Sequence, residues 1–393
     1  MSGPGEDLDA YRGSLRAWLA ANVPRNWRSE WARAETQENI GLQRRWLATL
    51  VEAGYAVPHW PAEFGGGATL MEQAVLHQEF ARANAPEILA FNVALNQIAR
   101  TLLDHGTPEQ LQHLGGMLRG EVWCQGFSES EAGSDLPALR MRADRDGDSF
   151  VLNGHKVWSS YAHLARWGMF LARTDPAAPK RRGLSIFLVD MTSAGVEVRN
   201  TRKITGGAEF NEIFLDNVRV SESAVLGGEN NGWAVSASTL NSERGTANVG
   251  HFERFDVLLQ KYTAAVAREG LDSDDVVVEG LGRGLVESEV LRSLGMRTVA
   301  EAAAGRPVGP QAAILKLYFG DLIQRVTAEA VATLGRETQV VHEDEVLDSY
   351  TSGHWMHDHL NSWTWTIAGG TSQIQRNLIG ERALGLPREP EIR

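Results

Sequence analysis

The chain has 393 residues, 43% hydrophobic and 22% charged, a composition typical of a globular protein whose length predicts two or three domains. A formal net charge of -12 argues against broad attraction to nucleic acid or to anionic membranes. No apolar run approaches the ~20 residues of a membrane span, and the acidic N-terminus lacks the apolar segment of a signal peptide. We therefore expect a cytoplasmic protein that does not bind membranes or nucleic acid.

Residues 1–120 have the periodicity of amphipathic helices. Stretches beginning at Leu8, Ile40 and Leu70 place apolar residues at spacings of three and four. Between them, residues 57–67 are rich in proline and glycine and predict a connecting loop. This region is predicted to be an N-terminal helical domain.

Residues 121–230 change to the alternation that is typical of strands. Two turn signals, Asp146-Gly147 and Asn153-Gly154, separate alternating segments, and further short strands follow as far as Leu226. A compact antiparallel β domain is expected here. Cys124, the single cysteine, has no internal disulfide partner and predicts a buried structural thiol in a reducing compartment.

Residues 231–393 return to helical periodicity, with a long apolar stripe at 312–334 and a polar turn at 268–275. They predict packed helices that form a bundle. The fold class expected is therefore α+β and multidomain. Its three predicted domains are an N-terminal helical domain (1–120), a central β domain (121–230) and a C-terminal helical bundle (231–393).

Three motifs, in this order, resemble those of the acyl-CoA dehydrogenase family. CQGFSESEAGSD (124–135) resembles the signature that ends in Ala-Gly-Ser-Asp, and NGHKVWSS (153–160) resembles Gly-x-Lys-x-Trp-Ile-Thr. IAGGTSQIQR (367–376) resembles the C-terminal Glu-Gly-Thr-Ser-x-Ile-Gln-Arg segment. The resemblance spans nearly the whole chain. It implies an oxidoreductase of lipid metabolism that uses FAD to convert an acyl-CoA thioester to the trans-2-enoyl-CoA.

The resemblance also implies which residues hold FAD. Small residues at 128–134 would let backbone N–H groups approach the polar edge of the flavin ring. Trp158 would cover the ring, Ser160 would reach its edge near N5, and Ser134 would face the thioester. The full set expected around the ring is Gln125, Phe127, Ser128, Gly133, Ser134, Trp158, Ser159 and Ser160. From the residues alone, a solvated acidic turn and a core tryptophan are the alternatives.

At the C-terminal motif, Thr371, Ser372 and Gln373 match positions that bind the ribityl-pyrophosphate side of FAD. The residues alone predict a polar helix start, with Thr371 or Ser372 as the cap. The two interpretations are compatible, because a helix start offers free N–H groups to phosphate.

The reaction needs a carboxylate at the α carbon of the thioester. Many family members supply it immediately before Gly-Thr, where this chain has Gly369, and a glycine cannot act as a base. In the isovaleryl-CoA and long-chain enzymes the glutamate comes from an earlier helix, and the corresponding stretch, TLNSERGTANVG, predicts Glu243 as the base. Expected ligand contacts are Asn241, Arg244, Gly369 and Gly370, with the Gly369 N–H donating to the thioester carbonyl. A solvated Glu-Arg pair on a helix surface is the alternative for 243–244.

Two family features are missing. An Arg-x-x-Phe-Gly segment is replaced by VAREGLDSDD (266–275), and a Gln-x-x-Gly-Gly segment by VVHEDEVLDSY (340–350). In the family both grip the adenine half of FAD across a subunit interface. Two other functions therefore stay open: a flavin monooxygenase or oxidase of the same fold, and a non-autonomous subunit of a heteromeric acyl-CoA dehydrogenase. The resemblance implies an electron-transferring flavoprotein as acceptor and a homotetramer, with a hetero-oligomer as the alternative.

Other candidate signals are weak. The GLGRG stretch at 280–284 lacks the third glycine of a dinucleotide loop and a βαβ context. His354, His357 and His359 lie as close together in the sequence as metal ligands often do. On a helix only the first two share a face, so no metal is expected. The sequence has no Gly-x-Ser-x-Gly elbow and no Cys-x-x-Cys pair, which argues against serine hydrolases and structural zinc.

Overall fold

The computed structural model describes residues 4–34, 36–242, 248–306, 308–341, 352 and 354–388. The chain divides into two compact units, each assembled from separate stretches of sequence. Unit 1 comprises Met1–Asn39, Gly67–Glu87 and Arg244–Arg393, and unit 2 comprises Ile40–Gly66 and Ile88–Glu243. The helices of the first 120 residues are thus shared between the units, and the domain boundaries expected at 120 and 230 stay a prediction.

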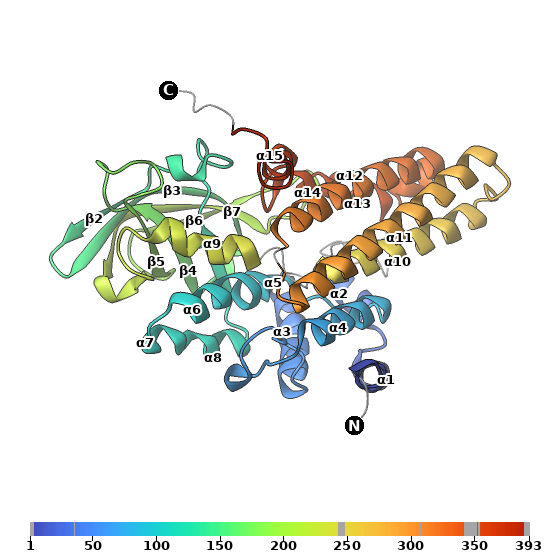
Figure 1. The fold of residues 1–393 in the computed structure, drawn as a ribbon, viewed down its shortest axis with the longest axis horizontal. Helices are drawn as coiled ribbons and strands as arrows, with labels where there is room; N and C mark the ends of the chain where they lie inside the picture. The colour runs from blue at the N-terminus through green and yellow to red at the C-terminus, as the bar shows by residue number, and fades with distance from the viewer. Residues whose placement is uncertain are drawn as a thin grey trace. The chain divides into compact units, whose positions relative to one another are not determined.

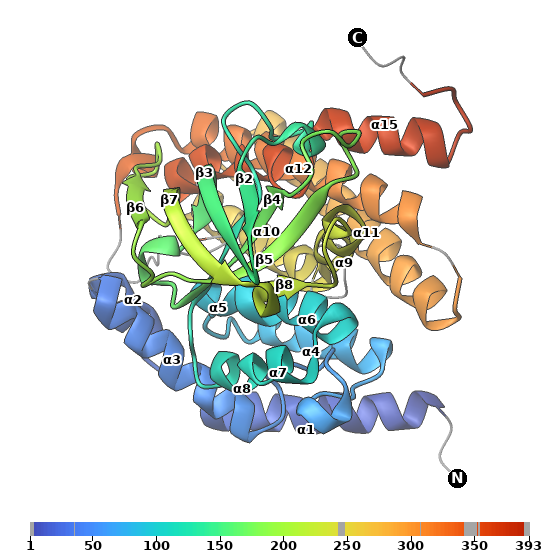
Figure 2. The ribbon, with the colours of Figure 1, turned by 90° about the vertical axis from the view of Figure 1, so that its left-hand side faces the viewer.

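Unit 2 is built on one eight-stranded sheet (Figure 2), in the order β6-β7-β3-β2-β4-β5-β8 with β1 on β4. Most pairings are antiparallel, whereas β1 and β2 each pair in parallel with β4. The predicted central β domain is confirmed, with these two parallel pairings added. The strands are β1 (Trp123–Gly126), β2 (Arg142–Asp146), β3 (Ser149–Ser160), β4 (Trp167–Arg173), β5 (Leu184–Asp190), β6 (Val196–Thr201), β7 (Phe210–Ser221) and β8 (Val225–Leu226).

One of the two predicted turns is wrong. Gly147 has φ 65° and closes the β2–β3 hairpin as expected. Gly154 instead lies inside β3, where the pairing with β7 shifts register. A Cβ at Gly154 would lie 2.8 Å from the Cα of Met141, so this glycine serves a close approach between backbones.

Strands β4 and β5 are buried on both faces, which explains their continuous apolar sequences. Met169 and Leu171 of β4 pack into a core with the helices of unit 2, while Phe170 points to a second core that includes Cys124 and Phe150. Burial raises the pKa of the Cys124 thiol to about 12, as a buried structural cysteine requires.

The helices of unit 2 lie along one side of the sheet (Figures 1 and 2). A π-helical segment joins α5 to α6, so these form one continuous helix. Most of α3 (Thr36–Glu52) belongs to this unit, together with α5 (Leu89–Asn92), the π segment (Val93–Ile98), α6 (Ala99–His105), α7 (Pro108–Leu111), α8 (His113–Leu118) and α9 (Gly232–Ser242). The 3₁₀ turns of unit 2 are Ala62–Phe64, Leu136–Ala138, Ala162–Leu164 and Glu222–Ala224.

Unit 1 is helical throughout its described part, and its three longest helices lie side by side (Figure 1). Phe255, Phe319 and Ile323 are central to its core. The predicted C-terminal bundle is confirmed. The helices are α1 (Pro4–Asn22), α2 (Trp27–Arg33), α4 (Leu70–Arg82), α10 (Asn248–Arg268), α11 (Asp275–Ala303), α12 (Gly309–Leu334), α13 (Trp355–Ser362), α14 (Thr364–Ile367) and α15 (Ser372–Arg382), with a 3₁₀ turn at Gly335–Gln339.

The glycine-rich stretch at 280–284 is helical, inside α11. Asp274 caps this helix by accepting from the N–H groups of Val276 (2.9 Å) and Val277 (3.3 Å), which confirms the polar turn predicted before it. Gly284 faces a Leu259 side chain that lies 3.0 Å from an added Cβ, so helix packing accounts for this glycine.

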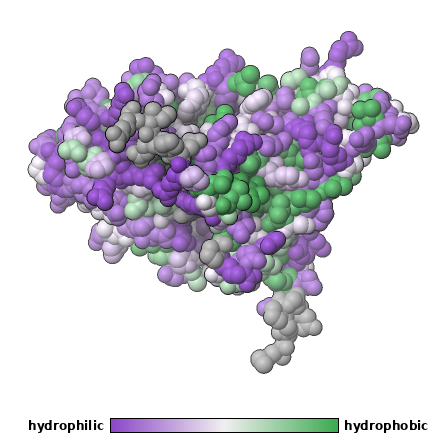
Figure 3. Space-filling model, turned by 45° about the horizontal axis from the view of Figure 1, so that its top comes forward, coloured by the Kyte–Doolittle hydropathy of each residue, from purple (hydrophilic) through white to green (hydrophobic). Residues whose placement is uncertain are grey.

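Among the helices that the structure describes, none combines the length and the apolar character that crossing a membrane requires. The face drawn in Figure 3 is mostly hydrophilic, and its hydrophobic residues gather in limited areas. That distribution agrees with the acidic, strongly charged sequence.

Candidate active site

Trp158 stands on a β-bulge of unit 2. The pairing of β3 with β7 shifts register between Lys156 and Ser159, so an extra residue is accommodated there. Trp158 has φ 62° and its side chain is 63% exposed, with its ring edge toward Phe210 at 6.1 Å between centroids. The left-handed backbone costs a non-glycine residue roughly 1–2 kcal/mol. Trp158 is therefore not the core tryptophan that the residues alone allowed, and its strain marks a candidate functional site.

A buried asparagine holds this bulge. Asn211 donates from Nδ2 to the backbone carbonyls of Ser159 (3.2 Å) and Glu209 (2.7 Å). Its Oδ1 accepts from the His163 backbone N–H at 3.2 Å and from the His163 ring Nδ1 at 2.9 Å. The amide is thus satisfied on both sides, and the surrounding bonds fix the strained residue between them.

The segment predicted to line the flavin is bonded to the same part of β3. Its carbonyl oxygens at Gln125, Phe127 and Ser128 all accept hydrogen bonds from β3. The donors are the Ser159 hydroxyl (2.9 Å), the Lys156 ammonium (3.0 Å) and the Val157 N–H (3.0 Å), respectively. Within the described part of the chain, the N–H groups of Phe127 and Ser128 have no acceptor.

A buried ion pair completes this attachment. Lys156 is 0% exposed and its Nζ lies 2.9 Å from Glu129 Oε1. Glu129 also accepts from the N–H groups of Arg140 (2.7 Å) and Met141 (2.9 Å). Burial lowers the pKa of Lys156 to about 8, although Glu129 acts in the opposite direction. Burial would raise the pKa of Glu129, but Lys156 and the two N–H donors bring it below its usual value.

The remaining predicted flavin residues of unit 2 differ in exposure. Gly133 and Ser134 are exposed, following a tight turn in which Glu129 and Ala132 exchange two backbone hydrogen bonds (3.2 and 3.0 Å). Ser160 is half-buried. The acidic stretch is therefore a solvated turn in part only, since Glu129 is drawn into the protein.

In unit 1 the glycine pair that precedes α15 also has a left-handed backbone. Gly369 has φ 64° and Gly370 has φ 93°. Buried Gln375 donates from Nε2 to the carbonyls of Gly369 (3.0 Å) and Gly370 (3.2 Å), and Lys316 Nζ donates to Gly370 at 2.5 Å. Both carbonyls thus accept hydrogen bonds from side chains of unit 1. The Gly369 N–H has no acceptor among the described residues.

Helix α15 begins as the sequence predicts. The Thr371 hydroxyl accepts from the N–H of Ile374 at 3.2 Å and caps the helix. Ser372 is buried and Gln373 is exposed. The cap interpretation is confirmed for Thr371, and the free N–H groups of this first turn have the chemistry to bind phosphate.

The predicted base falls outside the described residues. Glu243 and Arg244 both lie in the stretch 243–247, which the structure does not describe. Asn241 belongs to α9, but its side chain is not described either. The predicted site residues that the structure describes are therefore those around Trp158 in unit 2 and those around Gly369 in unit 1.

Sequence reasoning missed the residues that support both regions. Lys156 occupies the lysine of the Gly-x-Lys-x-Trp segment and could have been found there. Glu129 is the acidic residue of the first motif, and Gln375 and Lys316 carry no signal that reveals their bonds to carbonyls. Asn211 is an ordinary strand residue in the sequence. Burial and partners, which only the fold supplies, identify these side chains.

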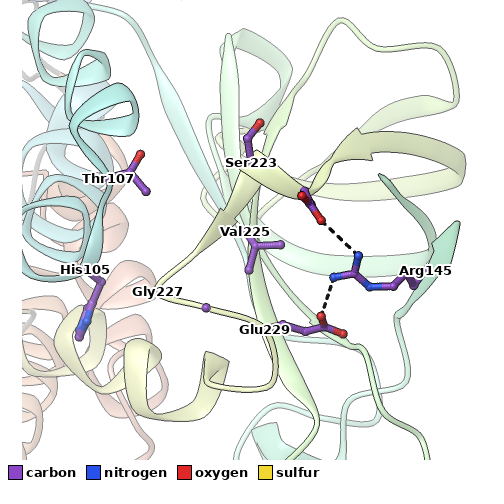
Figure 4. A pocket seen from close by; sticks show the side chains of 9 residues that line it. His105, Thr107, Arg145, Ser223, Val225, Gly227 and Glu229 are labelled. Carbon is purple, nitrogen blue, oxygen red and sulfur yellow. Dashed lines mark hydrogen bonds and ion pairs between the residues drawn. The ribbon is translucent and has the colours of Figure 1, made fainter. Parts of the chain in front are cut away.

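A pocket of about 680 Å³ in unit 2 was also not predicted (Figure 4). Arg145 lies at one side and pairs with Glu222 (3.2 Å) and Glu229 (2.7 Å), so its charge is already balanced. The His105 ring is bonded to Ser238 at 2.9 Å. None of the lining residues belongs to the predicted site; they are His105, Thr107, Arg145, Glu222, Ser223, Val225, Gly227, Gly228 and Glu229.

Two of the three histidines near residue 355 make hydrogen bonds through their rings. His354 caps α13 by accepting from the N–H of His357 at 3.0 Å, and the His359 ring lies 3.4 Å from the Thr327 hydroxyl. Within the described ranges, no three His, Cys, Asp or Glu side chains are grouped as metal ligands.

Comparison with known proteins agrees with this architecture. Models of the acyl-CoA dehydrogenase N-terminal, middle and C-terminal domains match residues 5–121, 124–218 and 230–384. The chain is 34% identical to acyl-CoA dehydrogenase IpdE1 of Mycobacterium tuberculosis over 391 residues, covering 98% of the chain and 99% of the relative. It is 40% identical over 348 residues to acyl-CoA dehydrogenase FadE34 of that organism, covering 86% of the chain but only 46%, about half, of the relative.

Solved structures have the same fold. The Tcur3481-Tcur3483 steroid ACAD superposes with a TM-score of 0.84 at 28% identity, covering 99% of each chain. The ChsE4-ChsE5 complex of Mycobacterium tuberculosis superposes with a TM-score of 0.79 at 26% identity, also covering 99% of each chain. The chain belongs to the acyl-CoA dehydrogenase family. Members of this family are FAD-dependent oxidoreductases, so the predicted family, fold class and cofactor are confirmed.

The residues of unit 2 fit a flavin. A flat ring with one polar edge needs an apolar face to lie against and N–H donors beside it. The exposed Trp158 indole offers the face, and the N–H groups of Phe127 and Ser128, which have no acceptor among the described residues, offer the donors. Hydrogen bonds join Trp158 and the segment 125–128, because β3 carries Trp158 and donates to the carbonyls of Gln125, Phe127 and Ser128.

Proposed function

We propose that this chain catalyses the α,β-dehydrogenation of an acyl-CoA thioester to the trans-2-enoyl-CoA. FAD, when bound, supplies the acceptor for the hydride that leaves the β carbon. Glu243 takes the α proton on its carboxylate, and the Gly369 N–H donates to the thioester carbonyl, where negative charge develops. The observation that carries the proposal is Gly369: the usual position of the base has no side chain, while its backbone is arranged to donate.

The backbone at Gly369 supports the donor role. Gln375 bonds the carbonyl of Gly369 at 3.0 Å, and that of Gly370 is bonded by Gln375 and Lys316. A donor that is fixed before substrate arrives stabilises developing charge without reorganising during the reaction. Gly370 and Ser134 are each proposed to contact the thioester, and Asn241 and Arg244 are proposed to contact the ligand.

FAD is proposed to be held by residues of the three family motifs. Trp158, Ser160 and the N–H groups of Phe127 and Ser128 are proposed to hold the ring. Gln125, Gly133, Ser134 and Ser159 complete its surroundings. The start of α15, Thr371 to Gln373, is proposed to hold the ribityl-pyrophosphate part, since a helix N-terminus favours an anion.

A heteromeric enzyme is the second candidate. The segments expected to grip the adenine of FAD are replaced at 266–275 and 340–350. Two solved relatives, Tcur3481-Tcur3483 and ChsE4-ChsE5, are named for two components. A partner of the same fold could supply the adenine contacts to this chain. Measuring the mass and the FAD content of the chain purified alone distinguishes a flavin-bearing homotetramer from an FAD-free chain that requires a partner.

Two further details remain proposals. Electrons are proposed to pass to an electron-transferring flavoprotein, and rapid oxygen consumption by the reduced protein would indicate oxidase chemistry instead. Because the solved relative Tcur3481-Tcur3483 is a steroid ACAD, steroid-derived thioesters are the first acyl group to test. A panel should compare them with straight-chain, branched and aromatic CoA esters, using an artificial electron acceptor.

The central test is Glu243→Gln. Loss of a catalytic base is expected to lower turnover by about 100- to 10,000-fold, while FAD remains bound. Glu279→Gln, an exposed residue of α11, is the matched control and should keep wild-type turnover. Near-full turnover of Glu243→Gln would remove Glu243 from the mechanism.

A further inference from the structure

We propose that Lys156 and Glu129 are positioning residues of the flavin site. Their buried ion pair holds the chain at Phe127–Glu129 against the bulge that carries Trp158, so that the ring face and the N–H donors keep one geometry. This inference rests on the proposed FAD site. It assigns a role in that site to two residues that are not expected to touch the substrate.

All the described bonds of the Lys156 ammonium lead to one short segment. Nζ donates to the Phe127 carbonyl at 3.0 Å and to Glu129 Oε1 at 2.9 Å. The next residue of β3, Val157, donates its N–H to the Ser128 carbonyl at 3.0 Å. Residues 127–129 are therefore bonded to Lys156 and Val157 through acceptor oxygens only, so none of these bonds uses the N–H groups of Phe127 and Ser128.

Glu129 anchors the far end of the segment. Its two oxygens accept from Lys156 and from the N–H groups of Arg140 and Met141, which directly precede β2. Its side chain is 10% exposed and that of Lys156 is 0% exposed. A residue with this many fixed partners has one orientation, so the segment cannot shift without breaking several bonds together.

Stability alone does not account for this pair. A buried ion pair contributes little net stability compared with apolar residues of similar volume, because both charges lose their hydration. The Lys156 pKa of about 8 also indicates that the lost hydration of the ammonium outweighs its attraction to Glu129. What apolar residues would not provide is a directed bond to the Phe127 carbonyl.

The test compares Lys156→Met/Glu129→Gln with the wild-type chain, because removing both partners avoids a lone buried charge. FAD binding to the apoprotein, the visible spectrum of bound FAD and thermal unfolding of the apoprotein are measured. We expect FAD affinity to fall at least about tenfold and the flavin spectrum to lose its resolved shoulders, with little change in the unfolding midpoint. The matched control is Arg199→Met/Glu197→Gln, which removes an exposed 2.7 Å pair on β6 and should bind FAD as the wild type does.

Unchanged FAD affinity and spectrum in the folded double variant would overturn the proposal. A lowered unfolding midpoint with unchanged FAD affinity would also overturn it, in favour of a purely structural pair. If the double variant does not fold, Lys156→Gln/Glu129→Gln, which also leaves no lone buried charge, should show the loss of affinity. FAD bound by a wild-type chain that lacks turnover contradicts the proposed reaction and leaves the positioning role standing, whereas a wild-type chain that binds no FAD, either alone or with a partner subunit, contradicts both.

Discussion

The two units present their site segments in the same backbone region with opposite residue types. Unit 2 places Trp158 at φ 62°, and unit 1 places Gly369 at φ 64°. In both, a lysine bonds a backbone carbonyl of the site: Lys156, on the same strand as Trp158, bonds the Phe127 carbonyl, and Lys316 of α12 bonds the Gly370 carbonyl.

The hydrogen bonds that support the two sites differ because one site has glycines at positive φ and the other has a tryptophan. A glycine adopts a positive φ at no steric cost, so two side chains suffice to orient Gly369 and Gly370. A tryptophan is strained at a positive φ. Unit 2 fixes it with the buried amide of Asn211, the buried ion pair Lys156–Glu129, and the hydrogen bonds from the end of β3 to the carbonyls of residues 125–128. A site can thus be fixed either by a permissive residue or by an enclosing network, and the network is needed where a side chain does the binding.

The largest expected effect is on stability at low pH, where both units behave alike. Burial lowers the pKa of His59 in unit 2 to about 4 and of His251 in unit 1 to about 3. Both are neutral at pH 7, and the unfolded chain takes up protons first, so stability falls as pH decreases from about 6.5. For His59 the loss by pH 4 is about 3 kcal/mol. His59→Gln and His251→Gln should each flatten the pH dependence of the free energy of unfolding, and an unchanged slope would contradict this prediction.

The second effect separates the units. Lys316→Met removes one of the two donors to the Gly370 carbonyl, so the Gly369 N–H should lose its set direction. We expect turnover to fall at least about tenfold, with FAD affinity changed by less than about threefold. Steady-state kinetics and FAD titration measure the two. Lys261→Met, which removes a longer 3.5 Å bond to the Ser352 carbonyl in the same unit, is the control. Equal losses in both variants would refute a specific role for Lys316.

The smallest effect concerns the backbone itself. Gly369→Ala should lower the free energy of unfolding by about 1 kcal/mol, since alanine is strained at φ 64°. Trp158→Gly should change it by less than about 0.5 kcal/mol, because relief of strain is offset by greater freedom of the unfolded chain and lost contact with Phe210. Denaturant unfolding measures both. A larger loss for Trp158→Gly than for Gly369→Ala would reverse the comparison.

Much of the fold could be predicted from the sequence. Periodicity gave the order helical, β, helical, and Thr371 was recognisable as a helix cap because capping depends on neighbouring residues. Asn153-Gly154 was misread because a short-range turn signal looks the same inside a long strand with a bulge. The division into units was also beyond local patterns, since each unit joins distant stretches.

From the sequence, only those site residues that lie within the family motifs could be predicted. Trp158 followed from the motif, whereas its exposure and strain depend on the register of β3 against β7. Lys156 and Glu129 are 27 residues apart, so their pairing needs the strand arrangement. Gln375 looks like any polar helix residue until its burial against two carbonyls is known.

The burial of Cys124 has a practical consequence. With the pKa of its thiol raised to about 12, almost no thiolate exists at neutral pH, so oxidants and alkylating reagents find little to attack. It is also the single cysteine of the chain. Any modification that does occur therefore reports the moment when the sheet interior of unit 2 opens to solvent, which makes this thiol a native sensor of local unfolding.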